Sequence, residues 1–325
     1  MLRTVTLALL LVSFSLFTGT ASALMTLHPL ESPNGDFKVV IAIGPFDQTS
    51  AAVFYKGENV LRLNQLGFLL ESGATIPSYS LTREHWEKFL EIEPTRPLPK
   101  LSEGMRLSHP FSREVRNEGE APYNESSVEY IGLLKIVFRA YDHGIAFRYE
   151  FGPREGKTLT IQKELTEFRF SDDYLCKTAG QESERVRLSG LIAAVESPLT
   201  VELSDSVSLI VGETPPGNFA PMKLRFGTKW ESTFNNLFDS EGKINRTGKP
   251  TSVVAALDRT VTILGADHSS WRFAILDGKE AEAIFESLKQ SNISFPLDFT
   301  PAPLPRPVGA TRIGDGDSPG FRRGL

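Results

Sequence analysis

Cysteine is almost absent from this chain of 325 residues, in which Cys176 stands alone. One cysteine cannot close a disulfide within the chain or build a zinc site from thiolates, so we expect Cys176 to be structural. An excess of positive charge is also lacking, because 35 Lys and Arg residues face 40 Asp and Glu residues, for a formal net charge of -5. This balance argues against nucleic acid or an anionic membrane as a partner.

Familiar catalytic motifs are missing as well. The chain has no Gly-x-Ser-x-Gly elbow, His-Glu-x-x-His helix, Gly-x-x-x-x-Gly-Lys loop or calcium loop of alternating Asp and Asn. Its five histidines lack the spacing of metal ligands, and the adjacent Asp172 and Asp173 should point apart. What remains is the composition of a folded protein, with 40% hydrophobic residues, which excludes a disordered or collagen-like chain.

The first 23 residues are typical of a secretory signal peptide. Arg3 supplies the positive end, residues 5–17 are apolar, and residues 21–23 read Ala-Ser-Ala, a cleavage site of small residues. The apolar stretch is shorter than the roughly 20 residues that span a bilayer, and no later run approaches that length. We therefore expect a secreted, extracellular protein without membrane contact after cleavage at residue 23. Sequons that would suit surface glycans stand at Asn124, Asn245 and Asn292.

Alternating apolar residues predict a protein built mainly of strands. Every second residue from Phe37 to Ile43 is apolar and would share one face. The clearest hairpin runs from Leu133 to Phe151, where Gly144 supplies a residue that accepts a positive φ and the second strand turns an aromatic face toward another layer. Further strands are expected at 158–162, 167–170, 186–191, 199–203, 207–211, 222–226, 253–257, 261–264 and 271–276. Without regularly interspersed helices, this pattern predicts an all-β fold, a large antiparallel β-sandwich.

Helices and the end of the chain complete the expected organisation. Apolar residues at helical spacing predict a helix at 279–290, and a weaker pattern suggests another at 82–91. From residue 300 the chain becomes rich in Pro and Gly, so we expect residues 24–299 to fold and residues 300–325 to form a disordered tail. Trp271 lies in an apolar strand and should belong to the core.

Five segments carry a resemblance to a known family: Leu30–Gly35, Gln65–Leu70, the hairpin Ile136–Phe151, Glu164–Phe168 and Ser269–Arg272. In this order they resemble the N-terminal domain of glycoside hydrolase family 97, whose members are α-glucosidases and α-galactosidases. The resemblance implies a galactose mutarotase-like supersandwich. In the family the catalytic machinery sits on a following (β/α)8 barrel of roughly 250 residues. Because only residues 300–325 follow here, we expect no enzyme activity from this chain by itself.

Glu213 is the residue to which the resemblance gives a role. The segment Ile210–Thr214 is similar to one from which, in the α-glucosidase branch, a glutamate reaches the active site and helps bind calcium. The resemblance thus implies a carbohydrate contact and a calcium ligand at Glu213, although a complete site needs six to eight oxygens. The family usually has His before this glutamate and tends to carry tryptophans near 174–176, whereas this chain has Gly212 and Tyr174-Leu175-Cys176. The other interpretation of Glu213 is an exposed loop carboxylate.

Trp230, among polar residues, is the better candidate to stack on a sugar ring. Together with Glu213 it leads to the hypothesis of a secreted, non-catalytic domain that binds α-glucosides or α-galactosides. An alternative is a fragment or split subunit of an α-glucosidase or α-galactosidase, with the barrel supplied in trans. A third hypothesis, mutarotase-like chemistry on the sandwich itself, requires a histidine and a carboxylate that face one cavity.

Overall fold

The computed structural model describes residues 26–43, 49–77, 105–108, 111–113, 121–153, 158–180, 184–227 and 251–293. Five predicted features lie outside them: the signal peptide at 1–23, the weaker helix at 82–91, Trp230, the sequon at Asn245 and the tail at 300–325. Within the described residues the strands pair antiparallel throughout and form large sheets, so the prediction of an all-β antiparallel sandwich is confirmed.

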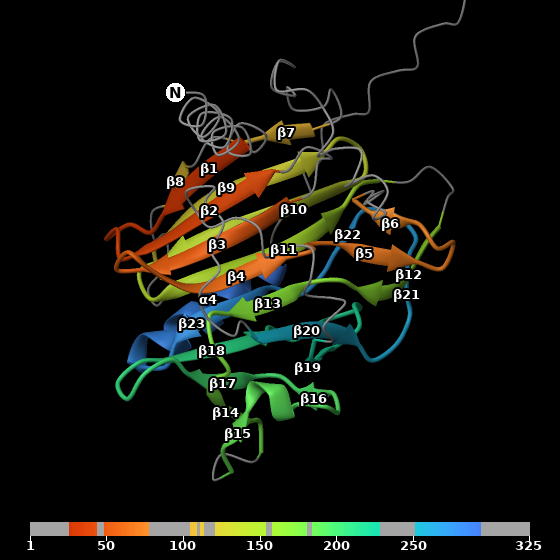
Figure 1. Cartoon of the computed structure of the whole chain (residues 1–325). Helices are drawn as coiled ribbons and strands as arrows, with labels where there is room; N and C mark the ends of the chain where they lie inside the picture. The colour runs from red at the N-terminus through yellow and green to blue at the C-terminus, as the bar shows by residue number, and fades with distance from the viewer. Residues whose placement is uncertain are drawn as a thin grey trace, which may run out of the picture.

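Two large sheets face each other (Figure 1). Across the first sheet the strands are β1 (Thr26–Glu31), β2 (Phe37–Ile43), β3 (Thr49–Tyr55), β4 (Glu58–Asn64), β13 (Glu167–Phe170), β20 (Thr251–Leu257), β19 (Met222–Phe226) and β16 (Val195–Glu196). Across the second they are β15 (Val186–Arg187), β14 (Leu175–Thr178), β17 (Leu199–Glu202), β18 (Ser208–Glu213), β23 (Arg272–Leu276), β11 (Gly144–Phe151), β10 (Leu134–Tyr141), β9 (Tyr123–Tyr130) and β7 (Met105–Leu107). In addition, β22 (Asp267–His268) pairs with β11, and β8 (Phe111–Arg113) pairs with β9.

A third, smaller sheet stands at one end of the sandwich. Its strands are β21 (Val261–Ile263), β12 (Leu159–Glu164), β5 (Phe68–Leu70) and β6 (Thr75–Ile76). Phe68 of this sheet lies edge-on against Tyr149 of β11, with ring centroids 4.6 Å apart. The smaller sheet therefore shares the core of the sandwich.

The core lies between the two large sheets. The face of β2 that the alternation predicted, from Phe37 to Ile43, is buried. Phe147 of β11 and Phe168 of β13 meet across the layers, with ring centroids 6.2 Å apart. Each such fully buried side chain contributes about 1.5–3 kcal/mol. Apolar packing thus holds the sheets together without a disulfide, and Cys176 is free and buried in the core, as predicted.

The predicted hairpin is β10 and β11, paired from Leu134 opposite Phe151 to Tyr141 opposite Gly144. The prediction that Gly144 provides a positive φ is wrong, because the residues with positive φ do not include it. A Cβ at Gly144 would lie 2.6 Å from the Cα of Ile275. Glycine is required here because β23 approaches the backbone closely.

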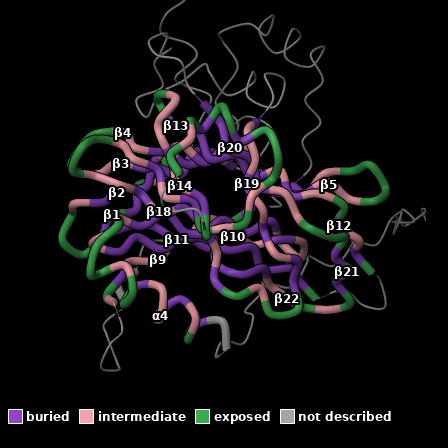
Figure 2. Tube along the Cα trace, turned by 90° about the horizontal axis from the view of Figure 1, so that it is seen from below, coloured by how far each residue is buried: buried purple, intermediate pink, exposed green. Residues whose placement is uncertain are grey.

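One helix, α4 (Lys279–Ile293), covers the outer face of the second sheet (Figure 2). It contains the helix predicted at 279–290 and is three residues longer. Ile284 and Leu288 are buried against that sheet, so the outer face of the hairpin is buried too. No helix in the described part of the chain is long and apolar enough to cross a bilayer.

The strand predicted at 186–191 is wrong beyond Arg187. Leu188–Gly190 form the 3-10 helix η2 instead. The N–H of Leu191 donates to the carbonyl oxygen of Leu188 (3.2 Å), while the Leu188 side chain is fully buried. The chain turns here to bury that leucine.

Candidate functional site

Glu213 ends strand β18 and stands directly opposite Arg272 of β23. Its Oε2 accepts hydrogen bonds from Nη1 of Arg272 (2.7 Å) and from Oγ of Ser270 (2.6 Å), and its Oε1 accepts one from the N–H of Met222 (2.6 Å). The side chain is only 6% exposed. Glu213 is therefore an oriented, largely buried carboxylate and not an exposed loop residue.

A second carboxylate shares the same arginine. Nη2 of Arg272 donates to Oε2 of Glu164 at 2.7 Å, and both side chains are fully buried. Oγ1 of Thr166 donates to Oε1 of Glu164 (2.8 Å), and the Tyr149 hydroxyl lies 2.6 Å from the same Oγ1. We call Glu164, Thr166, Tyr149, Arg272 and Glu213 the arginine network. With two carboxylates and one guanidinium, it carries one excess negative charge when both acids are ionised.

Burial and neighbouring charges oppose each other in this network. Burial raises the pKa of Glu213. The Arg272 guanidinium, the Ser270 hydroxyl and the Met222 N–H lower it, but burial outweighs them, so the net direction is upward. Burial also raises the pKa of Tyr149 well above its ordinary value. Burial lowers the pKa of Arg272, but Glu164 and Glu213 outweigh it, so the net direction is upward and the guanidinium stays charged.

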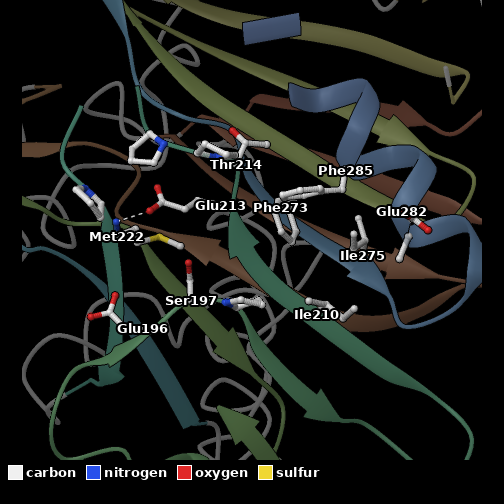
Figure 3. A pocket seen from close by; sticks show the side chains of 15 residues that line it. Glu196, Ser197, Ile210, Glu213, Thr214, Met222, Phe273, Ile275, Glu282 and Phe285 are labelled. Carbon is white, nitrogen blue, oxygen red and sulfur yellow. Dashed lines mark hydrogen bonds between the residues drawn. The ribbon is translucent and has the colours of Figure 1, made fainter. Parts of the chain in front are cut away.

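A pocket with a volume of about 530 Å³ opens beside Glu213 (Figure 3). It is lined by residues of the paired strands β18 and β23, of the first turns of α4 and of the segments 196–198, 214–216 and 221–222. Its walls are largely apolar, and three carboxylates stand in or around it. The lining residues are Glu196, Ser197, Pro198, Ile210, Glu213, Thr214, Pro215, Pro216, Pro221, Met222, Phe273, Ile275, Ala281, Glu282 and Phe285. We call this cavity the Glu213 pocket.

Trp271 is fully buried, which confirms its predicted place in the core. The guanidinium carbons of Arg139 and Arg148 lie 4.1 Å and 4.7 Å from its ring centroid. Arg139 also donates to Oγ of Ser291 (2.9 Å) in the last turn of α4. Trp271 therefore anchors the helix and has no ring face free for a sugar.

Comparison with known families identifies this architecture. The family model described as Glycosyl-hydrolase 97 N-terminal matches residues 30–296. The chain belongs to this family. The match confirms the resemblance that the hairpin and the four shorter segments carried. No curated protein matches this family 97 N-terminal domain significantly.

Solved structures support the same fold. A Glycoside Hydrolase Family 97 enzyme from Pseudoalteromonas sp. strain K8 in complex with acarbose superposes with a TM-score of 0.52 at 20% identity. A variant of that enzyme in complex with panose gives the same values. Each superposition covers 79% of this chain and 36% of the enzyme. The chain thus spans about a third of the length of these relatives, and the similarity concerns the fold alone.

Gly212 stands directly before Glu213, at a position where the family usually has histidine. A Cβ at Gly212 would lie 2.9 Å from Cζ of Phe273 and 3.1 Å from Cβ of Pro198. Phe273 is held in place by Phe285 of α4, with ring centroids 5.8 Å apart and nearly perpendicular rings. An apolar wall therefore occupies the space that a side chain at position 212 would need.

The described residues do not by themselves fit a calcium site. Among them no group of three or more His, Cys, Asp or Glu side chains could hold a metal ion. Glu213 is already paired with Arg272, and calcium takes six to eight oxygen ligands. The predicted calcium role of Glu213 therefore stays a prediction that requires ligands from elsewhere. No histidine lines the Glu213 pocket, so this cavity lacks the pair that mutarotase-like chemistry needs.

The structure also brings together residues whose roles the sequence did not reveal. Glu164 and Arg272 are 108 positions apart in the chain, and Glu213 joins them from a third segment. Each stands in a segment quoted for the family resemblance, but a local pattern cannot show which distant charges meet. Trp230 lies outside the described residues, so its predicted sugar contact stays a prediction.

Proposed function

We propose that this family 97 N-terminal domain is a secreted, non-catalytic carbohydrate-binding sandwich, and that the Glu213 pocket receives the sugar. The observation that carries the proposal is an oriented carboxylate beside an apolar cavity. A carboxylate has about four acceptor positions, and three donors occupy those of Glu213. About one position remains for a sugar hydroxyl.

The shape and the walls of the pocket also support a sugar ligand. Its volume of about 530 Å³ lies within the usual range of small-molecule sites. Phe273 and Phe285 offer apolar surface to the C–H face of a pyranose ring. Acarbose and panose are bound by the solved family 97 enzyme and its variant, which favours α-glucosides as the first ligands to test.

Calorimetric titration of the purified chain with maltooligosaccharides and α-galactosides tests this proposal. We expect saturable binding that weakens about tenfold or more in Phe285→Ala, because truncation of a buried aromatic anchor costs over 1 kcal/mol. Phe54→Ala, on strand β3 of the other sheet, is the matched control and should bind normally. Flat titrations with both sugar classes would refute the binding of α-glucosides and α-galactosides.

A second proposal is that the domain works beside a catalytic barrel supplied in trans. The reason for this proposal is that the superposition covers only 36% of the length of the solved enzyme. We expect the purified chain alone to leave aryl α-glucosides and α-galactosides uncleaved, and hydrolysis to appear with the barrel polypeptide. A search of the downstream genomic sequence for such a barrel is the first test, and hydrolysis by the chain alone would contradict both proposals.

Secretion rests on the first 23 residues. Expression of the full chain with its own N-terminus, followed by N-terminal sequencing of the exported protein, should give a new first residue at Leu24. Retention in the cell with Met1 intact would refute secretion.

A further inference from the structure

The Glu213 pocket is rich in hydrogen-bond acceptors and poor in donors. Its 15 lining residues include three Glu and no Lys, Arg or His. Four of them are prolines, which have no backbone N–H. The hydroxyls of Ser197 and Thr214 are the only side-chain donors in this lining, so a ligand that enters the cavity must supply most of the donors itself.

One backbone donor near the cavity is already engaged. The N–H of Met222 donates to Glu213. Oγ1 of Thr214 accepts a hydrogen bond from the N–H of Trp271 (3.1 Å), and Thr214 is fully buried. An anionic group such as a uronate or a sulfate would find little to bind and would face carboxylates.

The pocket also faces excess negative charge. In the arginine network the carboxylates of Glu164 and Glu213 share the guanidinium of Arg272. Of these three charged side chains, only that of Glu213 is partly exposed. Exposed Glu282, in the first turn of α4, adds a second charge. Glu196 adds little, because Nζ of Lys223 lies 2.8 Å from its Oε1. The carboxylates of Glu213 and Glu282 are therefore not fully neutralised by a cation at the cavity.

From this lining we infer that the Glu213 pocket selects glycosides that carry a protonated amine, such as oligomers of glucosamine, over neutral and acidic glycosides. The inference rests on the proposed carbohydrate function and names the class of sugar. An ammonium group brings three donors and one positive charge, which match an acceptor-rich, acidic lining. The pyranose body packs against Phe273 and Phe285 as a neutral sugar would.

Calorimetry with three probes of equal length separates the classes. The full chain is titrated with a glucosamine trimer, maltotriose and trigalacturonate at about pH 6, where the sugar amine is protonated. We expect the glucosamine trimer to bind about fivefold more tightly than maltotriose, the effect of one exposed ion pair. Trigalacturonate should bind most weakly, and added salt should reduce these differences.

Variants on one helix test the origin of the preference. Glu282→Gln should weaken the glucosamine trimer more than maltotriose. Glu286→Gln is the matched control, since it lies on the same helix outside the lining and pairs with Lys289 (2.7 Å); it should leave the preference unchanged.

The possible outcomes are distinct. Equal affinities, tightest binding of trigalacturonate, or an unchanged preference in Glu282→Gln would overturn the amine selectivity while leaving the carbohydrate proposal standing. Binding of none of the three probes would overturn both.

Discussion

The carboxylate of Glu213 and the guanidinium of Arg272 face each other across neighbouring strands, with Oε2 and Nη1 2.7 Å apart. The same guanidinium reaches Glu164 at the end of β12. Because β12 belongs to the smaller sheet, one arginine joins two sheets through charge. The pocket and the stability of the sandwich therefore depend on a common residue.

Replacement of Arg272 should be severely destabilising. Arg272→Met leaves two buried carboxylates without their cation, and we expect a loss of about 3–5 kcal/mol in the free energy of unfolding, measured in urea. Arg272→Lys should also lose stability, because an ammonium group cannot reproduce the planar fork that serves both acids. Lys38→Met breaks an exposed pair with Glu31 and should change stability by under about 1 kcal/mol. Similar losses in Arg272→Met and Lys38→Met would contradict this view.

Calcium should not stabilise the isolated chain. A site loaded at a hundred times its Kd would add about 2.7 kcal/mol, which shifts a melting curve visibly. We expect the same melting temperature in calcium and in EDTA, because Glu213 is paired with Arg272 and the described residues offer no metal cluster. A calcium-dependent rise that disappears in Glu213→Gln would show that the glutamate binds the metal after all.

Local patterns predicted much of this fold and little of its charge network. Alternation located β2 and the hairpin because one face of each strand must be apolar. Alternation failed at Leu188–Gly190, where the chain turns and buries Leu188. The separate prediction of a positive φ at Gly144 was wrong because the reason for glycine lies in a strand 131 positions away, at Ile275. The pairing of Arg272 with Glu164 is equally non-local. Residues that meet only after folding leave no periodic signal.

A methyl group at position 144 should disturb the second sheet. Its Cβ would lie 2.6 Å from backbone Cα of Ile275, so Gly144→Ala must push β23 away. We expect a loss of about 1–3 kcal/mol or more in urea unfolding. Gly265→Ala is the control, because nothing lies within 4 Å of a Cβ there and the mutation should be nearly neutral. Equal stability of the two variants would argue against close packing at Gly144.

The single thiol should react only on unfolding. Burial, together with the charges of Asp173 and Glu202, raises the pKa of Cys176 to about 11. Iodoacetamide at about pH 8 should leave the native thiol unmodified and label it in urea. Because the pKa of the thiol is higher in the folded protein than its ordinary value of 9.0, the contribution of the thiol to stability is full below pH 9.0 and declines toward pH 11. Cys176→Ala should lack that decline, and rapid labelling of native protein would refute burial.

The sequon at Asn124 should stay unmodified in the folded protein. Its Nδ2, the atom that would carry a glycan, donates to the carbonyl oxygen of Glu31 (2.8 Å), and Ser126 of the same sequon is fully buried. A variant with Asn245→Gln and Asn292→Gln isolates this site. Intact mass spectrometry after secretion from a eukaryotic host should show no added hexose, and a glycan on soluble, folded protein would contradict the expectation.

The hairpin of β10 and β11 has protein against both faces, the aromatic core on one side and helix α4 on the other. An ordinary surface strand tolerates exchange at every second position, but here consecutive positions are constrained. Saturation mutagenesis should show that substitutions are poorly tolerated at consecutive positions along β11. The sequence of β11 should therefore change slowly in evolution, which makes it the most useful stretch for detecting distant members of the family.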